Sequence, residues 1–89
     1  MVKEGGFLRE HIYADIEAEI KRQTEKWGTN TDLEHPLEWM LVVDEEIGEV
    51  AKALNEHYFR DMPFKPVEEE LIQVIAVIVS WIETERMKR

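Results

Sequence analysis

The 89-residue chain contains no cysteine. That absence excludes a disulfide framework, and it also excludes a metal site built from thiolates. A membrane-spanning run is missing as well, because the longest nearly apolar stretch, LIQVIAVIVSWI, falls well short of the roughly 20 residues that a transmembrane helix needs. The amino-terminal MVKEGGFLREH has no apolar h-region of a signal peptide. The sequence therefore predicts a soluble, cytoplasmic protein that does not bind membranes.

Positive charge is also scarce in this chain. Twenty acidic residues stand against 11 lysines and arginines, which gives a formal net charge of −9. That balance repels a polyanion such as duplex DNA unless basic residues are segregated, and the short run ERMKR suits the end of a helix better. We therefore expect no nucleic-acid partner. A phosphorylated small molecule still suits an acidic protein when a divalent cation lies between the two.

Strand patterns are absent too, because β-branched residues do not alternate with polar ones over a useful length. The periodicity instead predicts three main helices, over about residues 7–26, from Pro36 to near His57, and after Pro66. The polar segment GTNTDLEHP and the proline-containing HYFRDMPFKP separate them. A chain this short makes one domain at most, so we expect a single all-α domain over residues 1–89.

The third predicted helix is apolar on nearly every side from Leu71 to Ile82, and only Gln73 and Ser80 interrupt it. A helix of that kind is buried on most sides in a folded protein. Two other helices of similar length offer too little surface to cover it. We therefore expect the helical bundle to be completed by oligomerisation.

Acidic residues gather in the second predicted helix, where DEEIGEV must share the helix with core residues. On a helical wheel at about 100° per residue, Glu45 falls on the polar side, whereas Glu46 lies on the flank of the apolar arc. Glu46 and Glu49 are i,i+3 neighbours, with Cβ atoms roughly 5–6 Å apart. Glu70 and Gln73 repeat that spacing in the third helix. The apolar arc comprises Met40, Leu41, Val43, Ile47, Val50, Ala51 and Leu54.

An antiparallel return of the third helix along the second brings these two polar pairs to a similar height. Carboxylates that meet beside apolar surface repel one another, and their pKa values rise. A bound cation removes that penalty, and carboxylate oxygens are hard ligands that suit Mg²⁺ or Mn²⁺. The pattern is compatible with a metal site, whereas on spacing alone a solvated acidic face is the commoner arrangement.

The segment EEIGEV, followed further along the chain by EELIQV, resembles the EExxE…ExxD signature of the MazG-like all-α nucleoside triphosphate pyrophosphatases. RQTEKWG ahead of HPLEWMLVVDEEIGEVAKAL resembles the small single-domain members of that family, and the likeness covers roughly residues 16–82. The resemblance implies hydrolysis of a (deoxy)nucleoside triphosphate to the monophosphate and pyrophosphate. It also implies Mg²⁺, or Mn²⁺, as the cofactor and a homodimer or homotetramer as the assembly.

Residue by residue, the resemblance gives metal-ligand roles to Glu46, Glu49, Glu70 and Gln73, and catalytic roles to Glu45 and Glu46. Gln73 departs from the family, because the fourth ligand position is normally aspartate. An amide oxygen can coordinate a cation, but it is neutral and its side chain is one methylene longer. A non-catalytic helical oligomer, acting as a nucleotide-binding or assembly module, is therefore the alternative.

The residues that we expect to contact the substrate are Trp27, His35, Trp39, Lys52 and Asn55. An aromatic face stacks on a nucleotide base, and in this family the region between the first two helices commonly contributes to base recognition. Trp27 is therefore the first candidate for that role. Other interpretations remain open: a tryptophan in the core, His35 as the cap of the second helix, and Lys52 and Asn55 as solvated surface residues.

Overall fold

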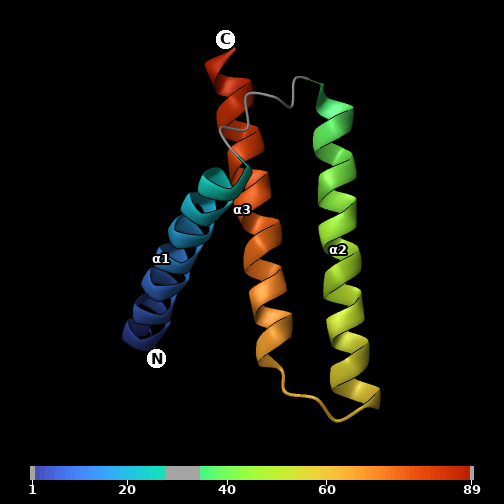
Figure 1. Ribbon diagram of the computed structural model, residues 1–89. Helices are drawn as coiled ribbons and strands as arrows, with labels where there is room; N and C mark the ends of the chain where they lie inside the picture. Colours follow the sequence, from blue (N-terminus) through green and yellow to red (C-terminus); the bar gives the residue numbers. More distant parts are fainter. Residues whose placement is uncertain (1, 28–34, 89) are drawn as a thin grey trace.

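The computed structural model describes residues 2–27 and 35–88 (Figure 1). Three helices form this part of the chain: α1 (Val2–Trp27), α2 (Pro36–Phe59) and α3 (Lys65–Met87). No strand occurs within residues 2–27 and 35–88, and the predicted all-α fold is confirmed. α1 begins earlier than the periodicity predicted, and α2 extends slightly past His57. None of the described helices offers an apolar stretch sufficient to cross a membrane.

The start of α2 is fixed by a cap that the sequence offered as one of two roles for His35. His35 has extended backbone geometry, and its Nδ1 accepts a hydrogen bond from the backbone N–H of Leu37 at 3.1 Å. Pro36 occupies the first turn, where its missing N–H costs nothing, and Glu38 lies at the positive end of the helix dipole. Local sequence therefore determines where this helix begins.

α3 is the central element of the molecule. Figure 1 shows α2 running antiparallel beside α3, while α1 lies obliquely against the other side of α3. α1 and α2 barely touch each other, and the chain measures 42 × 33 × 21 Å. Any site that uses both α1 and α2 must therefore be built around α3.

The connection between α2 and α3 reverses the chain within a few residues. Asp61 adopts a left-handed backbone conformation with φ 56°, which aspartate tolerates better than most residues. The backbone N–H groups of Arg60 and Met62 donate to the carbonyl of Glu56 at 3.0 and 3.3 Å. The Nδ1 atom of His57 lies 2.7 Å from the carbonyl oxygen of Met62. These bonds set the antiparallel return that brings the two acidic segments alongside.

The core between α2 and α3 is small and is built round two tryptophans. Trp39 is 1% exposed, and its ring lies parallel to that of Trp81 with 6.3 Å between centroids. Val43 and Val77 are buried beside them. Trp81 is partly buried and packs against this core.

The apolar arc predicted for α2 is only partly buried in this chain, since Val50 and Leu54 are half-buried and Met40, Leu41, Ile47 and Ala51 are exposed. The buried residues of α2 are Trp39, Val43 and Ala53, and only Val43 belongs to that arc. α3 packs against the flank of the arc, so Glu46 lies within the packed face. Several large apolar side chains remain exposed in the single chain, namely Leu37, Met40, Leu41 and Ile47 on α2 and Leu71, Ile75, Ile78 and Ile82 on α3.

Candidate acidic site at the helix interfaces

Glu46 and Glu70 are the centre of the candidate site. Glu46 lies on the face of α2 that also carries the buried Val43 and Ala53, and Glu70 lies in the second turn of α3. Both side chains are half-buried, and the Oε2 atom of each is shielded from solvent without a hydrogen-bond partner among the described residues. A buried polar atom without a partner is unfavourable in a folded protein. Two of the predicted metal ligands thus have oxygens that no described protein group satisfies.

Electrostatic repulsion adds to this burial. Burial raises the pKa of Glu46, and the charges of Glu70, Glu45 and Glu49 raise it further. Burial likewise raises the pKa of Glu70, with Glu49 and Glu69 as the next causes. The predicted rise in carboxyl pKa is therefore confirmed for both central residues. Glu49 itself is exposed, at the edge of the site.

A third helix contributes an acid that the sequence did not reveal. The charge of Glu19, on α1, also raises the pKa of Glu46 and of Glu70. The Glu19 side chain is only 13% exposed. The Arg22 guanidinium donates to both of its oxygens, from Nη2 to Oε2 at 2.6 Å and from Nε to Oε1 at 2.9 Å. These bonds lower the pKa of Glu19 and keep it ionised.

Gln23 fixes Glu19 relative to α3. Its Nε2 donates to Glu19 Oε2 at 3.1 Å and to the backbone carbonyl of Gln73 at 3.5 Å, and the residue is buried. A signal for both residues exists in the sequence, because at about 100° per residue Glu19 and Gln23 fall on the same stripe of α1 as Ile12 and Ile16. Polar residues within an apolar stripe indicate a buried polar contact, but they do not identify the partner.

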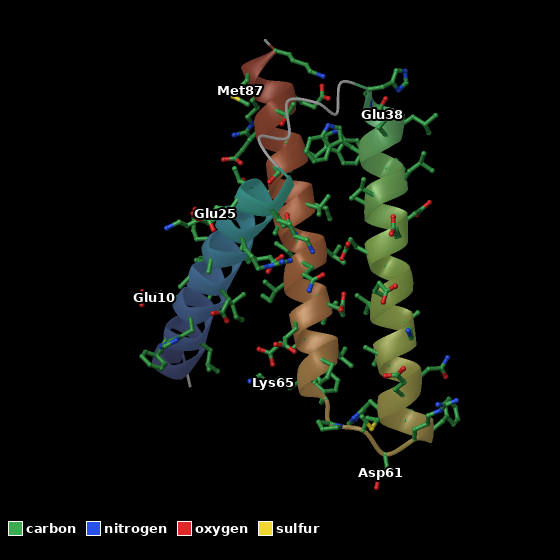
Figure 2. All side chains as sticks on the ribbon, in the orientation of Figure 1. Glu10, Glu25, Glu38, Asp61, Lys65 and Met87 are labelled. Carbon is green, nitrogen blue, oxygen red and sulfur yellow. The ribbon has the colours of Figure 1, made fainter. Side chains whose placement is uncertain are left out.

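A cleft of about 940 Å³ opens between α1 and the start of α3. Its volume lies within the range of small-molecule sites, roughly 300–1,000 Å³. The acids that line it are Asp15, Glu19, Glu68, Glu69 and Glu70, and the cations are Arg22 and Lys65, while Gln73 lies on the α3 wall. Figure 2 shows Lys65 at the amino-terminal end of α3, extending toward the side on which α1 lies. The cleft is therefore acidic, with a cation on each wall.

The remaining predicted residues lie apart from this cleft. Glu45 is exposed on α2, as the wheel predicted, and Trp39 is enclosed in the core, where no ring face is open to a base. Lys52 and Asn55 line a second hollow of about 610 Å³ at the far end of α2. Asn55 is about 180° round the helix from Glu46, so one chain does not bring this pair to the acids. The side chain of Trp27 lies outside the described residues.

The donor set suits a hard divalent cation. Carboxylate oxygens from Glu46, Glu49 and Glu70, with the amide oxygen of Gln73, are ligands that Mg²⁺ and Mn²⁺ accept. The unpartnered oxygens of Glu46 and Glu70 fit such a role. Within the part of the chain that the structure describes, however, no three acidic or histidine side chains are already gathered round one point. Among the described residues the donors are therefore not gathered into a preformed cation site.

Comparison of the chain with models of protein families, with curated proteins and with solved structures gave no match.

Proposed function

We propose that the protein is a Mg²⁺-dependent nucleoside triphosphate pyrophosphohydrolase, which cleaves a (deoxy)nucleoside triphosphate to the monophosphate and pyrophosphate in the upkeep of the nucleotide pool. One observation carries the proposal: Glu46 and Glu70 present buried, unpartnered oxygens to an acidic surrounding. Carboxylates in that state are stabilised by a divalent cation. The likeness of EEIGEV and EELIQV to the MazG-like signature supplies the reaction type.

The acids of the site have two parts in this proposal, cation binding and proton transfer. Glu46, Glu49 and Glu70 hold the cation, and Gln73 is a weaker, neutral fourth donor. When bound, Mg²⁺ or Mn²⁺ neutralises charge on the phosphate oxygens and polarises the attacking water. A carboxylate oxygen that the cation leaves free can accept the proton of the attacking water, and Glu46 is the first candidate for that step. Glu45, exposed on α2, is the second candidate for that proton transfer.

Association of chains belongs to the same proposal. On α3 the exposed residues Leu71, Ile75, Ile78 and Ile82 follow i, i+4, i+7 and i+11 spacing, which places them on one stripe. A continuous apolar stripe on a small chain is typical of an interface between subunits. This surface supports a homodimer or homotetramer.

The test is a panel of canonical and damaged nucleoside triphosphates incubated with Mg²⁺ or Mn²⁺, with released pyrophosphate as the readout. We expect turnover of at least one nucleotide and a loss of roughly 10²–10³-fold in Glu46→Gln, because a charge that stabilises the transition state is removed. Glu10→Gln, an exposed change on α1 outside the cleft, serves as the control. Absence of pyrophosphate release from every nucleotide would contradict the proposal.

A non-catalytic nucleotide-binding or assembly module is the second candidate. It is favoured by the neutral Gln73 in place of an acid and by the lack of a ready group of three acids among the described residues. Nucleotide binding with Mg²⁺, measured by calorimetry, without any pyrophosphate release would support this candidate over the enzyme.

A further inference from the structure

The cleft between α1 and α3 contains two cations whose part in the proposed reaction is unassigned. Arg22 lines its α1 wall and Lys65 its α3 wall, among five acids. Arg22 uses Nε and one Nη2 hydrogen for Glu19, which leaves other N–H donors of its five. Its side chain is 51% exposed, whereas Glu19 is 13% exposed. The guanidinium therefore holds a partly buried acid with one edge and presents the rest of its surface to solvent at the cleft.

The chemistry of this pair matches phosphate. A guanidinium is planar and binds phosphate oxygens through two parallel hydrogen bonds, and a lysine ammonium adds a point charge. An acidic cleft rejects a bare polyanion, but a cation bound by Glu46 and Glu70 lowers the local negative charge. Glu70 lines the same cleft as Arg22 and Lys65, so a cation held there would lie on the side that the two basic residues face.

We propose that Arg22 and Lys65 bind the triphosphate of the substrate, and that Glu19 holds Arg22 until the metal-bound triphosphate arrives. This inference rests on the proposed function for the choice of ligand. Arg22 changes partner, from the Glu19 carboxylate to the phosphate oxygens, and no covalent bond forms or breaks. Glu19 is thus a positioning residue for Arg22 and competes with the substrate for it.

The test uses the full chain and inorganic tripolyphosphate with Mg²⁺, titrated by calorimetry. Arg22→Gln should weaken binding about tenfold or more, because a hydrogen bond to a charged group contributes about 1.5–3 kcal/mol. Glu19→Gln should tighten binding, because Arg22 is released from its competitor. Lys65→Gln should weaken it, and Arg9→Gln, an exposed change outside the cleft, should leave it unchanged.

Opposite signs for Arg22→Gln and Glu19→Gln separate this inference from a merely structural salt bridge. If Arg22 only stabilised α1, both variants would weaken binding together, and circular dichroism would show the same loss of helix. Joint weakening of binding in both variants would overturn the inference. So would an unchanged affinity in Arg22→Gln, or a wild-type protein that does not bind tripolyphosphate. Tripolyphosphate binding through Arg22 without pyrophosphate release would instead refute the enzymatic proposal alone. Pyrophosphate release that is insensitive to Arg22→Gln would refute the inference alone.

Discussion

Glu46 opposes folding at neutral pH, and in the proposed function the same carboxylate is a metal ligand. Its pKa is raised in the folded protein, so the folded chain binds this proton more tightly than the unfolded chain. The resulting stabilisation is present below the ordinary carboxyl pKa of about 4.3 and is lost as the pH rises through the raised folded value. At neutral pH the ionised Glu46 therefore lowers the free energy of unfolding.

Glu46→Gln should accordingly stabilise the metal-free protein at pH 7.5, by on the order of 1 kcal/mol. In a domain of this size, that corresponds to roughly 4–8 °C in Tm. The two melting curves should converge near pH 4, where the wild-type carboxyl group is protonated. Thermal denaturation followed by circular dichroism checks both pH values, with Glu10→Gln as the exposed control. A lower Tm for Glu46→Gln at pH 7.5 would argue that its carboxylate is satisfied by the protein.

Gln73 is the residue whose role differs most between the two candidate functions, the enzyme and the non-catalytic binding module. Gln73→Asp replaces a neutral oxygen by an anionic one beside Glu70, so Mg²⁺ should bind more tightly and raise the Tm further by mass action. Without metal the same change adds repulsion, and the Tm should fall. Melting curves with and without Mg²⁺ measure both effects. An equal Tm shift in both conditions would mean that Gln73 lies outside the cation site.

The sequence alone predicted that Glu46 is partly buried, but it did not predict that Glu19 lies beside the candidate site. Glu46 lies beside apolar positions of its own helix, and helical periodicity alone indicates its partial burial. The relevance of Glu19 depends on where α1 crosses α3, and nothing local to residues 19–23 encodes that crossing. The prediction that Trp39 contacts the substrate was wrong because its ring is buried in the core. Local sequence could not show this, since the ring that stacks on it, Trp81, is far away in sequence.

At the scale of the helix, the starts of α2 and α3 were predictable, whereas the start of α1 and the buried face of α2 were not. Pro36 and Pro66 indicated where α2 and α3 begin, and Asp61 with its neighbours allowed the turn between them. The broad apolar arc of α2 has more width than one partner helix covers, so periodicity could not say which edge packs on α3. The tryptophan stack determines that choice, since it places Trp39 and Val43 against Val77.

α2 also carries a glycine in its interior that packing does not require. A Cβ added at Gly48 meets nothing within 4 Å, and the position is exposed. Gly48→Ala should therefore stabilise the protein by up to about 1 kcal/mol through helix propensity. Chemical denaturation measures the change. Gly6→Ala, also in open space but near the start of α1, should give a smaller gain. Destabilisation by Gly48→Ala would mean that another chain approaches this side of α2.

At the scale of the whole molecule, the exposed stripe of α3 predicts association. We expect sedimentation at micromolar concentration to show at least a dimer rather than the 10.6 kDa monomer. Leu71→Glu with Ile82→Glu should shift the equilibrium toward monomer, because charge placed in an apolar interface is strongly unfavourable. Arg9→Gln is the matched surface control. A folded monomer for the wild type would contradict the proposed assembly.

Because α1 forms one wall of the cleft and is held by few buried side chains, local opening of α1 removes the cleft. Between residues 6 and 26, Gln23 is the one buried side chain, and α1 packs on α3 with little help from α2. Elements with few buried contacts open locally before the whole protein unfolds. Amide hydrogen exchange should therefore be faster in α1 than in the centre of α3, and Mg²⁺ with tripolyphosphate should slow it selectively in α1. Equal protection of both helices would mean that the chain opens as a single unit.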